Sequence, residues 1–113
     1  MNNINYINKL PPENECGCAE YKFKIYSNYL NKNKKRFEQL KTQLLYRINE
    51  GCGYCIYFLG VKDNGEITNI TLDEINDSEN NLLKLISSLN LTLINKVNIT
   101  SNSNARSYVI CKI

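Results

Sequence analysis

The middle of the chain switches from a helical to a strand pattern of apolar residues. Four apolar residues at helical spacing predict an amphipathic helix over residues 36–49: Phe37, Leu40, Leu44 and Ile48. Gly51 favours the end of this helix, because glycine most easily adopts a left-handed cap. The continuous apolar run at residues 54–61 then predicts a strand. The Asp-Asn-Gly sequence at 63–65 follows and predicts a tight β-hairpin turn, since such turns need residues that tolerate positive φ.

A second helix is predicted after the hairpin and its return strand at 67–70. Thr71 and Glu74 have the spacing of a capping box, which marks a helix start. The polar residues 76–81 favour a main helix that begins separately near residue 78 and ends at about residue 89. The inward stripe of this helical region is predicted to be Leu72, Ile75, Leu82, Leu85, Ile86 and Leu89.

Three further strands complete the pattern, at residues 19–26, 91–99 and 106–113. The predicted order is β-α-β-β-α-β-β, an α+β two-layer sandwich in which both helices pack on one face of a mixed sheet of about five strands. The other face is expected to be partly wet, because lysines alternate with apolar residues in the strands. Tyrosines and four lysines are predicted to lie there: Lys22, Lys24, Lys96 and Lys112.

A chain of 113 residues is expected to form one core. Residues 1–18 are polar and contain Pro11 and Pro12, so they are predicted to be an N-terminal arm, with the domain over 19–113. The final predicted strand reaches the end of the chain, which favours an excised module of a larger protein.

The formal charge of +3 is too small to indicate nucleic acid by itself. No run reaches the roughly 18 apolar residues of a membrane span, and the first residues lack a signal-peptide pattern. We therefore expect a cytoplasmic protein without a membrane partner.

Five cysteines raise the question of a metal site. Four of them would give a zinc set, namely Cys16, Cys18, Cys52 and Cys55. The favoured alternative is no metal, with Cys55 and Cys111 as small apolar residues in strands, because structural zinc usually uses two Cys-x-x-Cys pairs and only one is present.

Catalytic groups are scarce. The chain has no histidine, which removes the commonest general base, and it has neither of the two glycine-rich phosphate-binding patterns. The chain alone is therefore predicted not to be an enzyme and to hold no cofactor. A small nuclease or a thiol enzyme using Cys52 or Cys55 is the disfavoured alternative.

Four motifs in order carry a family resemblance. They are LPPE at 10–13, EYKFK at 20–24, RFEQLKTQL at 36–44 with Arg47 and the Glu-Gly pair at 50–51, and GVKDNG at 60–65. Together they resemble the N-terminal domain of the GTP-binding protein 1 and 2 family, translational GTPases related to EF-Tu. The resemblance covers about residues 10–75, and the cysteines at 16, 18, 52 and 55 depart from the family's pattern.

This resemblance implies a non-catalytic accessory domain that precedes a GTPase domain, which would begin shortly after residue 113 and would bind GTP and magnesium. The implied partners are that GTPase domain, the ribosome or an RNA-surveillance factor. The hairpin at 58–67 is also similar to that of AlbA-like domains in Schlafen-type proteins, some of which handle RNA or DNA.

An RNA-binding module is the alternative function. A basic loop and helix face would follow the phosphate backbone while nearby tyrosines stack on bases. The candidate contacts for RNA or another partner are Lys32, Lys34, Lys35, Arg36, Lys41 and Arg47.

Overall fold

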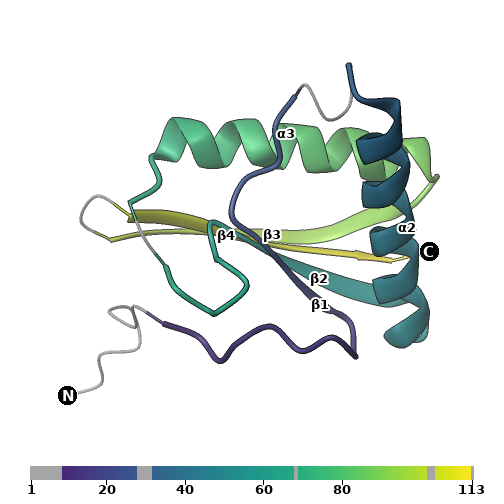
Figure 1. The fold of residues 1–113 in the computed structure, drawn as a ribbon, viewed down its shortest axis with the longest axis horizontal. Helices are drawn as coiled ribbons and strands as arrows, with labels where there is room; N and C mark the ends of the chain where they lie inside the picture. The colour runs from purple at the N-terminus through teal and green to yellow at the C-terminus, as the bar shows by residue number, and fades with distance from the viewer. Residues whose placement is uncertain (1–8, 28–31, 68, 102–103, 113) are drawn as a thin grey trace.

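Two helices and a four-stranded mixed sheet make up the computed structural model, which describes residues 9–27, 32–67, 69–101 and 104–112 (Figure 1). The elements in chain order are β1 (Ala19–Lys22), α2 (Lys34–Glu50), β2 (Tyr54–Leu59), α3 (Leu72–Ser88), β3 (Thr92–Ser101) and β4 (Asn104–Lys112). The predicted α+β class is confirmed, and both predicted helices are present.

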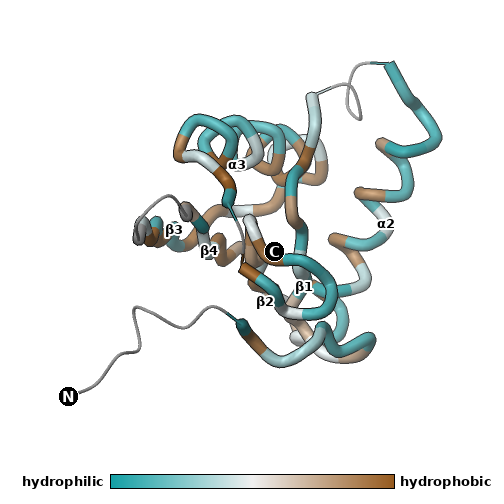
Figure 2. The backbone as a smooth tube through the Cα atoms, turned by 60° about the vertical axis from the view of Figure 1, so that its left-hand side comes forward, coloured by the Kyte–Doolittle hydropathy of each residue, from teal (hydrophilic) through white to brown (hydrophobic). Residues whose placement is uncertain are grey.

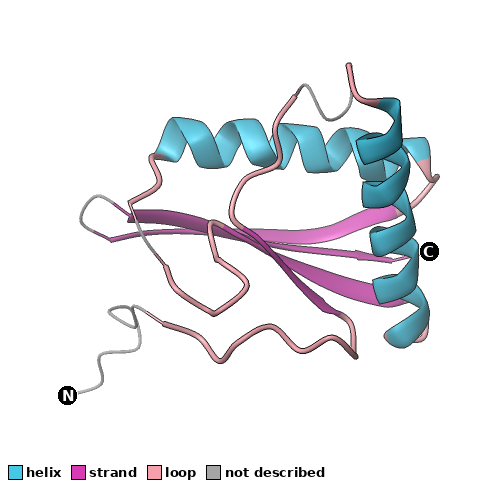
Figure 3. Cartoon of the chain, viewed as in Figure 1, coloured by secondary structure: helices cyan, strands magenta, loops and turns pink. Residues whose placement is uncertain are grey.

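The strands lie in the order β1-β2-β4-β3. β1 pairs parallel to β2, as expected when a helix connects them, whereas β2–β4 and β4–β3 are antiparallel. Both helices cover the same face of this sheet (Figure 3). The sheet therefore has one face beneath the helices, the helix face, and one face without a helix, the open face.

The main core lies between the sheet and the two helices. α2 buries Leu40, Leu44 and Ile48, which are part of the predicted stripe, and Phe37 packs partly buried beside them. In the tube coloured by hydropathy, the apolar positions of both helices turn toward the sheet (Figure 2). The side chains that meet them from α3 and the sheet are Ile75, Leu82, Leu85, Ile86, Cys55, Tyr57, Leu59, Val109 and Cys111.

The predicted return strand at 67–70 is wrong. The turn itself forms, with Gly65 N donating to Lys62 O at 2.8 Å, but the pairing beyond it is one isolated bridge between Val61 and Ile67. Both edges of β2 are occupied by β1 and β4, so a third strand has no ladder to join. The chain instead buries Ile70 in the main core and enters α3.

Polar residues inside α3 bind the chain that leaves β1. Ile25 is buried, its N–H donates to Ser78 Oγ at 3.0 Å, and its carbonyl accepts from Asn81 Nδ2 at 2.7 Å. These bonds satisfy buried backbone groups that no ladder reaches. They explain why β1 ends at Lys22 and why the polar stretch 76–81 lies within one continuous helix, contrary to the predicted separate start.

The predicted capping box at the start of α3 is confirmed. Thr71 Oγ1 accepts from Glu74 N at 3.2 Å, and Thr71 N donates to Glu74 Oε1 at 3.0 Å. The predicted inward position of Leu72 is wrong, since its side chain is 47% exposed. As the first residue of the helix it precedes the turn that reaches the core.

The open face carries aromatic and aliphatic side chains. Alternation opposite the buried residues of β2 and β4 assigns to it Tyr54, Ile56, Phe58, Tyr108, Ile110 and, from β3, Val97. Lys112 lies opposite Tyr54 on this face, as predicted. The other three lysines do not lie there: Lys96 pairs with Glu79 of α3, Lys24 pairs with Glu74 of α3, and Lys22 pairs with Glu20, which faces α2.

Residues 9–18, called here the N-terminal segment, pack against the domain. Leu10 N donates to Gly65 O at 2.8 Å, and Leu10 contacts a small second core of Tyr21, Val61 and Ile67. A Cβ at Gly65, whose φ is +93°, would lie 2.0 Å from Leu10 O, so this approach requires glycine. The domain boundary between residues 18 and 19 stays a prediction.

Candidate functional site

Basic side chains gather at the N-terminal end of α2. Lys32, Lys34 and Lys35 are exposed, Arg36 is half-buried, and the first turn of the helix has no acidic residue. Asn33 caps the helix by accepting from Arg36 N at 3.0 Å. A shallow groove continues along the helix, lined by Lys35, Arg36, Glu38, Gln39, Thr42 and Gln43. The structure thus brings four of the six predicted contact residues together at one end of α2.

Lys41 lies one turn further along α2. Its ammonium pairs with Glu38 Oε2 at 3.0 Å and lies 4.9 Å from the centre of the Phe37 ring. The glutamate neutralises part of its charge, which weakens any attraction to phosphate. Lys41 therefore adds less to the basic end of α2 than its sequence position implies.

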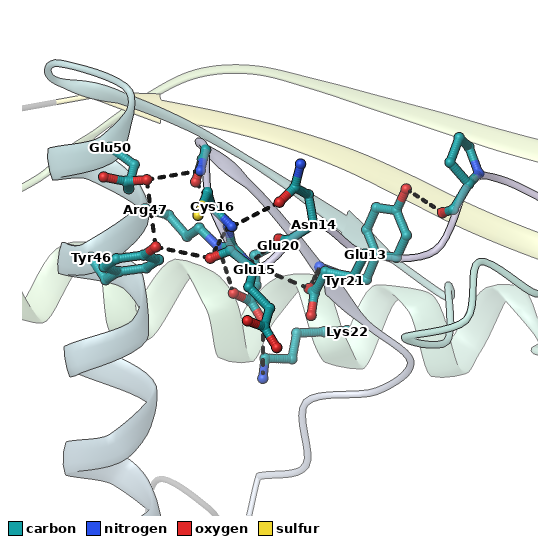
Figure 4. Close-up of polar contacts among 12 residues, drawn as sticks. Glu13, Asn14, Glu15, Cys16, Glu20, Tyr21, Lys22, Tyr46, Arg47 and Glu50 are labelled. Carbon is teal, nitrogen blue, oxygen red and sulfur yellow. Dashed lines mark hydrogen bonds and ion pairs between the residues drawn. The ribbon is translucent and has the colours of Figure 1, made fainter.

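Arg47 is buried, so it does not belong to a surface contact. Its side chain is 4% exposed, and its Nε donates to Glu20 Oε1 at 2.9 Å (Figure 4). Glu13 Oε2 lies 3.9 Å from Nη2. Burial raises the pKa of Glu13, while the hydrogen bond from Tyr21 N lowers it. The guanidinium of Arg47 thus lies between the carboxylates of Glu13 and Glu20. This arrangement is stable because the planar guanidinium holds its N–H donors in a fixed geometry that matches carboxylate oxygens.

The remaining donors of Arg47 bind the backbone of the N-terminal segment. Nη1 donates to Gly17 O at 2.8 Å and to Glu15 O at 3.3 Å, and Nη2 donates to Asn14 O at 2.9 Å. Two neighbours of Arg47 on α2 add one contact each: Tyr46 OH donates to Glu15 O, and Glu50 accepts from Gly17 N (Figure 4). We call these residues the Arg47 network. It fastens the N-terminal segment to the C-terminal half of α2 and to β1.

The four cysteines of the proposed zinc set are not assembled. Cys55 lies in the core with its Sγ 3.2 Å from Cys111 Sγ, whereas Cys16 and Cys52 are exposed. Within the described ranges, no group of three or more His, Cys, Asp or Glu side chains is placed to hold a metal ion. The hydrogen bond to Cys111 and burial raise the pKa of Cys55 far above its usual value. This thiol therefore stays protonated, which argues against the nucleophile of the thiol-enzyme alternative.

A small cavity of about 260 Å³ lies between the end of β1 and the start of α3. Lys24 and Glu74 form an ion pair in its wall, which also contains Asp73, Asp77 and Tyr26. The hydrogen bond from Lys24 holds the pKa of Glu74 at about 2, below its ordinary value of 4.5, and bonds from Thr71 act in the same direction. The contact joins the chain after β1 to α3.

Acid titration should reveal this contact. A carboxylate whose pKa is lowered by folding stabilises the fold above its unfolded-state pKa, and that stability is lost as the pH falls through the folded-state pKa. For Glu74 the window runs from 4.5 down to about 2. In urea unfolding across this window, Glu74→Gln should lose less stability with falling pH than the parent chain, and Lys24→Met should behave similarly. Identical pH dependence in all three proteins would contradict the contact.

Comparison with curated proteins finds a similarity to GTP-binding protein 2 of two organisms. The chain is 42% identical to GTP-binding protein 2 of human and of mouse over 69 residues, which are 61% of this chain and 11% of each relative. Over this stretch the chain is similar to GTP-binding protein 2. The predicted resemblance to the GTP-binding protein 1 and 2 family is thereby confirmed over that stretch. No protein-family profile and no solved structure matches the chain.

The similarity to GTP-binding protein 2 covers part of this chain and a small part of the relative. Three surfaces of the domain are candidates for contact with a partner: the basic end of α2, the free edge of β3 and the open face. Sequence patterns located the first of these. The open face was predicted as a partly wet face with tyrosines, and the strand order decides which residues lie on it. The free edge of β3 was missed, because it depends on strand order alone. No helix in the described ranges is long and apolar enough to cross a membrane.

Proposed function

We propose that this chain is a non-catalytic accessory domain of an EF-Tu-like GTP-binding protein, and that it contacts the GTPase domain of that protein. The observation that carries the proposal is the 42% identity to GTP-binding protein 2 over a stretch that is 11% of the relative. A small shared region beside a much larger remainder is the arrangement expected of an accessory domain. GTP and magnesium would bind in that remainder, and the ribosome or an RNA-surveillance factor would be a further partner in the cytoplasm.

The free edge of β3 is the surface that we assign to this contact. β3 ends the strand order, spans ten residues and contains no proline. It exposes Leu93, Ile94 and Val97 by 38%, 46% and 43%. A long edge with exposed apolar side chains accepts a further strand unless charge or proline blocks it, and the one charged residue of β3, Lys96, pairs with Glu79 of α3. The opposite edge, β1, is only four residues long.

One amide of β3 identifies which backbone groups face outward. Lys96 N donates to the side chain of Asn95 at 2.8 Å, so this amide points away from β4. Asn98 lies two residues further along the strand and its amide points the same way. Proline at Asn98 would therefore remove an outward donor without breaking the ladder to β4.

The test is binding to human GTP-binding protein 2 from which the matching region has been deleted, measured by calorimetry with GTP and with GDP. The deleted region itself serves as the positive control. Asn98→Pro should weaken binding by about tenfold or more, because a hydrogen bond contributes about 0.5–1.5 kcal/mol and the ring obstructs the added strand. Asn98→Ala, which keeps the amide, should bind like the parent chain. Binding of the positive control without binding of this chain overturns the proposal.

RNA binding by the basic end of α2 is the second candidate function. It is supported by Lys32, Lys34 and Lys35, which are exposed beside a helix start without acidic residues. Cations there oppose the helix dipole, a small cost that a bound phosphate would offset. Replacing Lys34 and Lys35 by glutamine should abolish salt-dependent binding if this surface follows a phosphate backbone.

A further inference from the structure

The open face presents a continuous aromatic and aliphatic surface on the two central strands. Phe58 of β2 and Tyr108 of β4 are register partners, and their ring centres lie 4.8 Å apart at a tilt of 55°. Tyr54, at the other end of β2, is 51% exposed. Tyr21 continues the group on β1 but is nearly buried, because the N-terminal segment covers it. Phe58, Tyr108 and Tyr54 therefore form the accessible part.

The charged side chains of β2, β3 and β4 are all cations. Between Thr92 and Lys112 the chain carries Lys96, Arg106 and Lys112 and no carboxylate, and β2 has no charged residue. Lys96 points to α3, which leaves Arg106 and Lys112. They stand at opposite ends of the β4 residues that carry Tyr108 and Ile110, about 20 Å apart along the strand.

Arg106 is a buried cation that lacks a carboxylate among the described residues. It is 5% exposed, and there its side chain makes one hydrogen bond, from Nε to Tyr108 OH at 3.2 Å, and no ion pair. A guanidinium has five N–H donors, and within the described residues only the Nε donor of Arg106 has an acceptor, Tyr108 OH. A buried charge is costly without a counter-charge. An anion bound next to Tyr108 would supply it.

We propose that the open face binds single-stranded nucleic acid. Bases would stack on Tyr54, Phe58 and Tyr108, and phosphates would pair with Arg106 and Lys112. Four-stranded sheets with aromatic residues on their central strands recognise single strands in this way, because stacking needs an exposed ring and phosphate needs a nearby cation. The site lies on a different surface from the basic end of α2, and it does not rest on the accessory-domain proposal.

The test is fluorescence anisotropy of labelled ten-nucleotide oligo-uridine, oligo-adenosine and oligo-thymidine titrated with the chain. We expect dissociation constants of about 10⁻⁶ to 10⁻⁴ M. With two phosphate contacts on a single strand, affinity should fall about sevenfold between about 50 and 200 mM salt. Stronger binding of the two RNA oligomers identifies RNA as the ligand, and equal binding identifies single strands of either kind.

Variants of the open face locate the site. Tyr108→Leu and Tyr54→Ser should each weaken binding by about fivefold or more, as expected for loss of one stacked base. Lys112→Gln should reduce the salt dependence by about half, because one of two phosphate contacts is lost. Tyr54 and Lys112 are exposed, so Tyr54→Ser and Lys112→Gln are expected to fold. These two variants test the site even if Tyr108→Leu does not fold.

Two control variants separate this site from other surfaces. Tyr26→Ser removes a tyrosine of similar exposure, 46%, in the chain after β1, where it lines the cavity beside the start of α3, and should bind like the parent chain. Glutamine at both Lys34 and Lys35 tests the basic end of α2 separately, and it distinguishes that candidate surface from the open face. Binding that is lost with the lysine pair and kept in Tyr54→Ser and Lys112→Gln would overturn the proposal. Absence of salt-dependent binding to all three oligomers would overturn it as well, and would leave a protein partner for the open face.

Discussion

Replacing Arg47 by methionine is expected to lower the free energy of unfolding by about 3–5 kcal/mol, because the buried Glu20 would lose the cation that hydrogen-bonds to it and keep only Lys22, at 3.4 Å. Glu20 is 5% exposed and Arg47 is 3% exposed, so water cannot take over the role of the guanidinium. The carbonyl oxygens of Asn14 and Gly17 would lose the donor that Arg47 supplies, and that of Glu15 would keep only Tyr46 OH. The loss should therefore loosen the N-terminal segment as well as α2.

Urea unfolding followed by circular dichroism measures this effect. Lys41→Met is the matched control, since Lys41 lies on the same helix and also pairs with a glutamate, but in a pair whose Glu38 side chain is 56% exposed. It should change stability by less than about 1 kcal/mol. Arg47→Lys should fall between the two, because an ammonium keeps the charge and loses the planar fork. A cost below about 1 kcal/mol for Arg47→Met would show that the Arg47 network does not support the fold.

Leu44→Ala is expected to cost about 2–5 kcal/mol, because it leaves a cavity where α2 packs on the sheet. Leu44 is 0% exposed and belongs to the main core with Tyr57 and Leu59 of β2. The tight packing around it leaves little room for neighbouring side chains to close the cavity.

The next residue on the helix provides the control for this substitution. Leu45 is 48% exposed, so Leu45→Ala removes the same atoms from a position outside the core. It should change the free energy of unfolding by no more than about 0.5 kcal/mol. Equal effects of the two substitutions, measured by the same urea unfolding, would contradict the packing of α2 described above.

The helices and turns were predictable because their signals are local. The spacing of Leu40, Leu44 and Ile48 located α2, and Thr71 with Glu74 located the start of α3. A helix stripe or a capping box lies within a few residues of chain, so its chemistry does not depend on what packs against it. The tight turn at 63–65 was predictable for the same reason.

The candidate site was less predictable because a charged residue has the same sequence signal whether it is exposed or buried. Lys34 and Lys35 are exposed, as the RNA alternative requires, whereas Arg47 on the same helix is buried among carboxylates and carbonyls. Burial of a cation depends on partners that are distant in sequence, here 27 residues away in Glu20 and 30 in Gly17. The polar residues Ser78 and Asn81 were missed for the same reason, since their partner Ile25 is 53 and 56 residues away.

The sequence by itself determined the two helices, the tight turn, the α+β class and the resemblance to the GTP-binding protein 1 and 2 family, all of which rest on short-range patterns or ordered motifs. Only the tertiary structure decided the strand order, and with it which side chains are on the surface. Placing β4 between β2 and β3 denied the return strand a partner, left β3 as a free edge and aligned Phe58 with Tyr108. Strand pairing is set by hydrogen bonds between distant segments, and a local pattern cannot specify which segments meet.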